Sequence, residues 1–240
     1  MFHLSRSARS LTALSAGVLG ALLLAFGPLA DGGDEDEAPV RSARAKAVDL
    51  SDGVTPVEVG KLVPDFTLTD TAGNEHTLGE VLARGEIVVL EWFNPDCPIV
   101  RNYHDSSRSA YTEATSMAAT RKTVAQAGVI WLAINSGAPG NQGAGLERNL
   151  KAIEEYGLSY PVLLDEEGKV GRMFAARTTP HMFVIQPDGI LAYAGAIDDG
   201  SPRAPGETNY VVAAVHALKS GEDIEKTETE PFGCSVKYGR

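Results

Sequence analysis

The sequence has no long run of lysine or arginine. Its 21 basic residues are outnumbered by 32 acidic ones, and the formal charge is −11 at pH 7. Nucleic-acid binding calls for a basic face, so this balance argues against a nucleic-acid partner. Internal repeats are absent as well, which excludes a repeat architecture.

Cysteine is almost absent, because Cys97 and Cys234 are the only two in 240 residues. They can form one disulfide or act as a reactive pair, and the sequence alone leaves both open. Neither cysteine lies near the end of the apolar N-terminal stretch, which argues against a bacterial lipoprotein.

The N-terminal segment, residues 1–30, has the features of an export signal. Arg6 and Arg9 form a short basic region, residues 11–30 are apolar and uncharged, and an acidic run follows at residues 34–37. This order predicts a signal peptide or a signal anchor, and both stay open because the apolar stretch is about as long as a membrane span. We therefore expect an exported protein, periplasmic or in the cell envelope, with membrane anchoring through residues 11–30 as one alternative.

The rest of the chain divides into three parts by composition. Hydrophobic residues make up 43% and charged residues 22%, as is typical of a soluble globular protein. Residues 31–56 lack periodicity and predict a flexible acidic linker. A globular domain is expected over residues 57–220, and residues 221–240 form a C-terminal tail that carries Cys234.

Short, wholly apolar runs predict strands that are buried on both faces. These runs cover residues 87–90, 129–134, 182–185 and 190–193. The last two are joined by Pro187-Asp188-Gly189, which predicts a β-hairpin. Alternation over residues 65–70, followed by a turn at residues 72–74, predicts a second hairpin at the N-terminal side of the domain.

Helices are expected between the strands. Residues 98–127 fit one helix with an irregular middle, residues 210–218 fit a final helix, and Leu146, Leu150 and Ile153 recur at helical spacing within residues 146–156. The order of elements predicts an α/β sandwich with a central mixed sheet flanked by helices.

The segment that carries chemistry is residues 92–98, which follows the first buried strand. Pro98 suits the first turn of a helix, so Cys97 is expected at or near a helix N-terminus. Unpaired backbone N–H groups there favour a thiolate, the form of cysteine that attacks peroxides and disulfides. The alternative is that Cys97 is a small buried apolar residue.

Thr179-Pro180 immediately precedes the strand of the Pro-Asp-Gly hairpin and is a candidate cis peptide. Together with residues 63–68, residues 88–97 and Pro187-Asp188-Gly189, it resembles the thioredoxin-like superfamily. Within that superfamily the resemblance is to the redoxin branch: the alkyl hydroperoxide reductase, thiol-specific antioxidant and membrane-anchored thiol-disulfide oxidoreductase proteins. It spans residues 57–220 and implies a thioredoxin-like sandwich in which Cys97 lies beside Thr179 and Pro180.

Two departures from that family pattern concern the reaction. Members with two local thiols carry Cys-x-x-Cys, but Asn94 stands where the first cysteine would be, so ordinary Cys-x-x-Cys exchange is not available. Peroxiredoxins carry Pro-x-x-x-Thr-x-x-Cys, but Leu90 and Asn94 occupy the Pro and Thr positions. Their active-site arginine has no clear counterpart, and Arg101 or Arg177 is a candidate substitute.

Cys234 has three interpretations. It can fold back and resolve an oxidised Cys97 by forming a disulfide, it can form a static disulfide that staples the tail, or it can remain a free thiol. The first restores the second thiol that Asn94 removes, and we take it as the working hypothesis.

Three further residues are candidates near Cys97. His104 lies two helical turns after Cys97, and it can help to hold the thiolate or be an ordinary surface histidine. His181 follows Pro180 and can approach Cys97, and a sulfur with two histidines would suit copper. Glu91 is either a buried acid poised for proton transfer or a solvent-facing residue.

The leading hypothesis is a thiol-based oxidoreductase, of peroxiredoxin-like or thiol-disulfide exchange type, with Cys97, Cys234, Thr179 and Pro180 as its catalytic residues. A peroxide or a protein disulfide is the expected substrate, a thiol of unknown identity is the electron donor, and no cofactor is expected. The alternatives are a non-catalytic thioredoxin-fold module that binds copper or a protein partner, and a scaffold with a purely structural disulfide.

Overall fold

The computed structural model describes residues 55–105, 107 and 111–239. The predicted export signal and nearly all of the predicted linker lie outside these residues. Within the described part of the chain, no helix is both long and apolar enough to cross a membrane.

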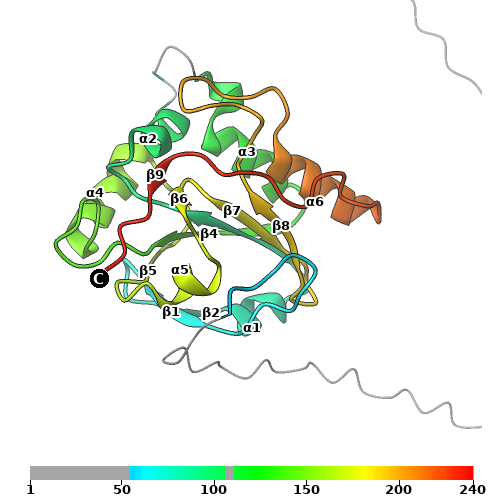
Figure 1. Cartoon of the computed structure of the whole chain (residues 1–240), viewed down its shortest axis with the longest axis horizontal. Helices are drawn as coiled ribbons and strands as arrows, with labels where there is room; N and C mark the ends of the chain where they lie inside the picture. Colours follow the sequence, from blue (N-terminus) through cyan, green and yellow to red (C-terminus); the bar gives the residue numbers. More distant parts are fainter. Residues whose placement is uncertain (1–54, 106, 108–110, 240) are drawn as a thin grey trace, which may run out of the picture. The chain divides into compact units, whose positions relative to one another are not determined.

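A seven-stranded mixed sheet forms the centre of the molecule, in the order β2-β1-β5-β4-β3-β7-β8 (Figure 1). The strands are β1 (Thr67–Asp70), β2 (Glu75–Thr77), β3 (Ile87–Trp92), β4 (Val129–Asn135), β5 (Val162–Leu164), β7 (Met182–Ile185) and β8 (Leu191–Gly195). Strands β3, β4 and β5 are parallel, whereas β3 and β7 are antiparallel. The fold is therefore the expected α/β sandwich with a mixed sheet.

Both predicted hairpins lie at the edges of this sheet. Strands β1 and β2 pair antiparallel around the turn at residues 72–74. Strands β7 and β8 pair antiparallel around Pro187-Asp188-Gly189, where Gly189 has φ of +87°. Glycine adopts a positive φ without steric cost. A Pro-Asp-Gly sequence therefore predicts a tight turn at this position.

The helices are α1 (Leu78–Leu82), α2 (Pro98–His104), α3 (Met117–Ala125), α4 (Leu146–Tyr156), α5 (Lys169–Met173) and α6 (Tyr210–Ser220), with a short 3-10 helix over Glu113–Thr115. Residues from α3 and α6 pack on one face of the sheet with Ile87 and Val89, and residues from α1 and α5 pack on the other with Val88 and Leu90. Strand β3 is wholly buried because its two faces each meet a helical layer.

The prediction of one helix over residues 98–127 is wrong. Helix α2 ends at His104, because the next residue, Asp105, is extended with φ of −104° and ψ of 91°, and α3 begins only after Ser116. The Ser116 side chain accepts the backbone N–H of Ala119, which is the geometry of a helix N-cap. Two helices therefore replace the single expected one. The strand β5 and the short helices α1 and α5 were not predicted from the sequence.

The tail after α6 returns to the sheet instead of leaving it. Its backbone exchanges hydrogen bonds with Ala194 at the edge strand β8 through Thr227 and Thr229. Further along, β9 (Cys234–Ser235) pairs antiparallel with β6 (Thr178–Thr179), as Figure 1 shows where the red tail passes beside β6. This second, two-stranded sheet lies at the segment that carries the predicted cis peptide.

Candidate functional site

Cys97 lies where β3 ends and α2 begins, as the sequence predicts. It is the N-cap residue of α2, and Pro98 is the first residue of that helix. A turn precedes it, closed by the Cys97 N–H and the Asn94 carbonyl at 3.1 Å. The cysteine is 1% exposed, so its thiol is covered in this conformation.

The peptide bond between Thr179 and Pro180 is cis, and it adjoins Cys97. The thiol of Cys97 donates a hydrogen bond to the Thr179 carbonyl oxygen at 3.0 Å. In the β6–β9 pair, Thr179 is opposite Cys234, and the Thr179 hydroxyl donates to the Cys234 carbonyl at 3.4 Å. Thr179 therefore contacts both cysteines.

The structure also brings Cys234 to Cys97, with both present as free thiols. Burial raises the pKa of Cys234 to about 11, and hydrogen bonding to Cys97 and the charge on Cys97 add to the increase. Cys234 is therefore protonated at neutral pH, so it is poorly suited to be the attacking thiolate of the pair. Val100 and Asn94, three residues to either side of Cys97, are not thiols, and Cys234 is its only potential thiol partner within the chain.

Gly233 allows the tail to approach this closely. Its φ is +151°, and a Cβ atom placed on it would lie 2.1 Å from the Thr179 carbonyl oxygen. Any other residue would force the tail and the cis-proline loop apart. The glycine before Cys234 is thus a steric requirement of the docked tail.

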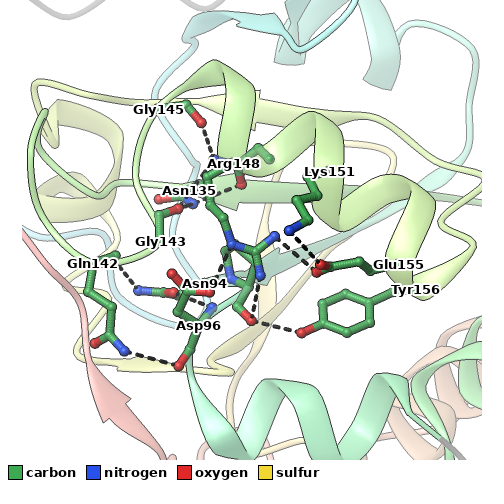
Figure 2. A network of polar contacts seen from close by, with 12 residues as sticks. Asn94, Asp96, Asn135, Gln142, Gly143, Gly145, Arg148, Lys151, Glu155 and Tyr156 are labelled. Atoms are coloured by element: carbon green, nitrogen blue, oxygen red, sulfur yellow. Dashed lines mark hydrogen bonds and ion pairs between the residues drawn. The ribbon is translucent and has the colours of Figure 1, made fainter.

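Helix α4 holds the turn before Cys97 (Figure 2). Arg148 Nε lies 2.8 Å from Asp96 Oδ1, and the Tyr156 hydroxyl donates to the Pro95 carbonyl at 2.8 Å. The Asp96 and Arg148 side chains are partly buried, so solvent and salt screen their attraction less than that of a surface pair. These contacts fix the loop that presents Cys97.

Asn94 adds a second tie on the other side of the same turn. Its side-chain amide donates to the Gln142 carbonyl at 3.0 Å, and its Oδ1 accepts the Asp96 N–H at 2.8 Å. A Cβ atom on Gly143 would lie 1.9 Å from Asn94 Oδ1, so a glycine is needed there. Asn94, which replaces the first cysteine of a Cys-x-x-Cys motif, is 3% exposed and has become a structural residue.

Glu91 is completely buried, so its interpretation as a solvent-facing residue is wrong. Its carboxylate accepts the Trp131 indole N–H at 3.1 Å and the Tyr160 hydroxyl at 3.2 Å, and His104 Nε2 lies 2.8 Å away. Burial, together with the charge on Glu91, raises the pKa of Tyr160 well above its usual value.

His104 is not a surface histidine either, because its side chain is only 3% exposed. It lies between the rings of Phe93 and Tyr156 and directs its Nε2 to Glu91. The ring is therefore engaged with the carboxylate instead of the Cys97 thiol. The geometry assigns Glu91 and His104 to one buried polar cluster.

His181 is buried as well, and its ring packs against Phe183 at 4.3 Å between centroids. Its Nδ1 accepts the Arg177 backbone N–H at 3.3 Å, so the neutral ring carries its proton on Nε2. Burial, and to a lesser extent the charge on Arg177, lowers the pKa of His181 to about 3. The histidine is therefore neutral at physiological pH.

Neither candidate arginine contacts Cys97 by a hydrogen bond. The Arg177 guanidinium pairs with Glu230 at 3.0 Å on the surface. Arg101 lines an open cavity of about 750 Å³ between α2 and α4, together with Asp96, Arg148 and Lys151. Within the residues that the structure describes, no group of three or more His, Cys, Asp and Glu side chains is arranged to hold a metal ion.

Sequence reasoning missed two residues that organise the site. Arg148 orients the turn before Cys97, but nothing in an amphipathic helix distinguishes it from a solvent-exposed arginine. Tyr238 anchors the tail through its hydroxyl, which donates to the Ala176 carbonyl at 2.8 Å. The sequence feature connected with this anchor is the pair of glycines Gly168 and Gly171, which contact the Tyr238 ring in the structure.

Comparison with known proteins gives one family. Residues 59–194 match the AhpC/TSA family. That region contains Cys97 and the cis Thr179-Pro180 step, and it ends before the tail that carries Cys234.

Two curated relatives match about the same part of the chain. The thiol-disulfide oxidoreductase ResA of Geobacillus kaustophilus strain HTA426 is 30% identical over 135 residues, which are 56% of this chain and 67% of that protein. ResA of Geobacillus thermodenitrificans strain NG80-2 is 29% identical over 136 residues, with the same coverage of both chains.

Two solved structures have the same fold over a larger part of the chain. A hypothetical protein from Sinorhizobium meliloti 1021 superposes with a TM-score of 0.65 and 26% identity, covering 77% of this chain and 97% of that one. An uncharacterized conserved protein from Geobacillus kaustophilus has a TM-score of 0.65 and 25% identity, with coverage of 78% and 98%.

Proposed function

Because the chain belongs to the AhpC/TSA family, we propose that it is a thiol-dependent oxidoreductase in which Cys97 attacks the substrate and Cys234 resolves the product. The substrate is a disulfide or a peroxide, and an external thiol regenerates the enzyme. The names of the curated relatives, both thiol-disulfide oxidoreductases, support the disulfide.

One observation carries this proposal: Cys97 and Cys234 pack in one cluster beside the cis Thr179-Pro180 step. The Cys97 thiol lies 3.0 Å from the Thr179 carbonyl, and Thr179 is opposite Cys234 in the β6–β9 pair. Burial and the neighbouring Cys97 raise the pKa of Cys234 to about 11, so Cys234 is protonated at neutral pH. A Cys234 that is protonated at neutral pH leaves Cys97, at the N-terminus of α2, as the candidate nucleophile.

With a disulfide substrate, the Cys97 thiolate attacks one sulfur, and the other sulfur of the substrate leaves as a thiolate and takes up a proton. Cys234 loses its proton and attacks the Cys97 sulfur of the mixed disulfide. The remaining half of the substrate leaves as a thiol, and a Cys97–Cys234 disulfide is formed. The substrate gains two electrons and two protons, and the two cysteines lose them.

With hydrogen peroxide, the Cys97 thiolate attacks one oxygen and becomes a sulfenic acid, and hydroxide leaves and is protonated to water. Cys234 then attacks the sulfenic sulfur, and its proton leaves with the hydroxyl group as a second water. Both substrates give the same oxidised enzyme. Thr179 and Pro180 would form the wall against which the substrate sulfur or oxygen lies.

The proposed location is outside the cytoplasm. It rests on the basic, apolar and acidic order of residues 1–37, and the names of the relatives do not bear on it directly. An oxidising compartment also suits a protein whose only two cysteines cycle between thiols and a disulfide. Fractionation of cells that express the full chain tests this part of the proposal.

The reaction itself is tested by oxidising the reduced protein with one equivalent of hydrogen peroxide or of oxidised glutathione and mapping the products by mass spectrometry. We expect a Cys97–Cys234 disulfide that dithiothreitol reverses. The variant Cys234→Ser should stop at a sulfenic acid or a mixed disulfide on Cys97, whereas Cys97→Ser should not react. A protein in which Cys97 stays a thiol with both oxidants would refute the proposal.

A further inference from the structure

Cys97 cannot meet an external oxidant in the conformation that the structure shows. Its side chain is 1% exposed, and the tail lies over it with Cys234 in contact. The core on the other side of Cys97 consists of packed side chains such as Phe93 and Val100. The cover that can move at lowest cost is the tail, because β9 pairs with β6 over only two residues.

Tyr238 anchors the end of this cover. Its hydroxyl donates to the Ala176 carbonyl at 2.8 Å, and the Arg172 guanidinium lies over its ring at 4.8 Å from the centroid. A Cβ atom on Gly168 would lie 2.6 Å from the tyrosine ring, and one on Gly171 would lie 2.4 Å from its hydroxyl. The ring therefore occupies a socket on α5 that exists only because both residues are glycines.

Backbone contacts on both sides of the ring strengthen this attachment. The Lys237 carbonyl accepts the Ala138 N–H and the Asn141 side-chain amide, each at 2.9 Å. The Gly239 carbonyl accepts Arg172 Nη2 at 3.0 Å. The donors Ala138 and Asn141 belong to the loop after β4, and the donor Arg172 belongs to α5. The end of the tail is therefore attached to parts of the fold that are distant from Cys97 in the sequence.

The link between this anchor and the thiol is short. Three residues lie between Cys234 and Tyr238. The first of them, Ser235, is exposed, and its hydroxyl accepts a hydrogen bond from Lys237 Nζ at 3.3 Å. At about 3.3 Å per residue the anchor restricts Cys234 to a small volume around Cys97. A detached tail would give Cys234 a far larger volume and leave Cys97 uncovered.

We infer that Tyr238 is a latch: seated in the Gly168–Gly171 socket it positions Cys234 over Cys97, and its release exposes Cys97 to the substrate. Tyr238 is thus a positioning residue that regulates the site. The effect of the latch on the reaction rests on the proposed function. The latch itself is tested without any redox step.

The first experiment measures how fast iodoacetamide alkylates Cys97 in the full chain, after the protein has been reduced and the reductant removed. A Cys234→Ser background is used so that one thiol is followed. We expect Tyr238→Ala to accelerate alkylation roughly tenfold or more, because opening of the tail limits access. Tyr238→Phe keeps the ring and loses the hydroxyl, so its rate should lie between the two. The matched control Ser235→Ala, on the same tail, should leave the rate unchanged.

A surface variant guards against misfolding of Tyr238→Ala. Asn141 is exposed, and Asn141→Ala removes only the hydrogen bonds to the Lys237 and Tyr238 carbonyls. It should accelerate alkylation by a smaller factor while the circular dichroism spectrum stays the same. Equal alkylation rates in the background, Tyr238→Ala and Asn141→Ala proteins would overturn the latch, as would an equal acceleration by Ser235→Ala.

The second experiment separates this inference from the proposed function. With both cysteines present, Tyr238→Ala should oxidise faster at Cys97 but close the Cys97–Cys234 disulfide more slowly, so dimedone should trap more sulfenic acid than in the unaltered protein. If alkylation shows the latch effect and neither protein forms the disulfide, the proposed function fails and the latch stands. If the disulfide forms at the same rate in both proteins, the positioning role of Tyr238 is refuted.

Discussion

Gly233 approaches the carbonyl of Thr179 so closely that a Cβ atom on residue 233 would lie 2.1 Å from that oxygen. The contact lies directly before Cys234, in the strand pair that brings the two cysteines together. The tail can therefore dock only because residue 233 has no Cβ atom.

We predict that Gly233→Ala displaces the tail and slows formation of the Cys97–Cys234 disulfide. Overpacking of this kind costs about 1–3 kcal/mol, which corresponds to a rate reduction of roughly 5- to 160-fold if the docked tail is required. The rate of disulfide formation is measured by oxidising the protein with one equivalent of peroxide, quenching at timed intervals and mapping the peptides. Ser235→Ala serves as the control and should behave like the unaltered protein, and an undiminished rate in Gly233→Ala would contradict the prediction.

The pair formed by Asp96 and Arg148 is expected to stabilise the turn before Cys97. Its partly buried atoms are 2.8 Å apart, so a double-mutant cycle with Asp96→Asn and Arg148→Met should give a coupling free energy of about 1–2 kcal/mol in urea unfolding. The exposed pair Arg177–Glu230 provides the comparison and should give less than about 0.5 kcal/mol. Equal coupling in the two pairs would show that burial adds nothing at the turn.

Replacement of Glu91 should destabilise the protein more than any surface glutamate. Glu91→Ala leaves three buried groups, on His104, Trp131 and Tyr160, without their acceptor. We expect the free energy of unfolding to fall by about 3–5 kcal/mol. The exposed Glu80 in α1 is the control, and Glu80→Ala should change stability by less than about 0.5 kcal/mol. A loss below about 1 kcal/mol in Glu91→Ala would show that these three groups do not depend on the Glu91 carboxylate.

His181 should make the folded protein sensitive to mild acid. Its pKa is about 3 in the folded state, against 6.5 for an ordinary histidine, so the unfolded chain takes up the proton first as pH falls. Stability from this residue is complete above pH 6.5 and is lost between pH 6.5 and about 3, at up to about 1.4 kcal/mol per pH unit.

The variant His181→Asn keeps an acceptor for the Arg177 N–H but does not titrate in this range. Urea unfolding at pH 7 and pH 4.5 should therefore show a smaller loss of stability in the variant than in the unaltered protein. The exposed His216 is the control, and His216→Asn should retain the full loss. Identical pH profiles for all three proteins would exclude a contribution from burial of His181.

The sequence was sufficient for elements with a strong local signal. Strands β3 and β4 follow from uninterrupted apolar runs, and the β7–β8 hairpin follows from Pro187-Asp188-Gly189. The placement of Cys97 at a helix N-terminus follows from Pro98. In each case a few neighbouring residues determine the backbone, so no tertiary information was needed.

The same kind of reasoning failed where tertiary contacts decide. Leu146 and Leu150 indicate helix α4 by their spacing, yet they are 48% and 44% exposed. The buried side of α4 carries Asn149, whose side chain bonds to Asn135 and to the backbone near Gly143. A buried asparagine in a polar network has no signature in hydrophobic periodicity.

The neighbours of Cys97 also depend on contacts that a linear pattern does not encode. His104 and Glu91 were two separate candidates in the sequence, and only the packing of α2 on β3 joins them. The tail reaches Cys97 through a two-residue strand pair and a tyrosine socket, and neither is long enough to create a periodic signal. That Cys234 could meet Cys97 was therefore a hypothesis until the fold was known.

The position of β9 long after Cys97 in the sequence also orders events during synthesis. Cys97 and its sheet partners leave the ribosome well before Cys234, and at typical elongation speeds the interval is on the order of ten seconds. During that time Cys97 lacks the tail that covers it in the folded chain. If Cys97 has the reactivity proposed for it, an oxidant can reach it until the residues of β9 have been made and have paired with β6.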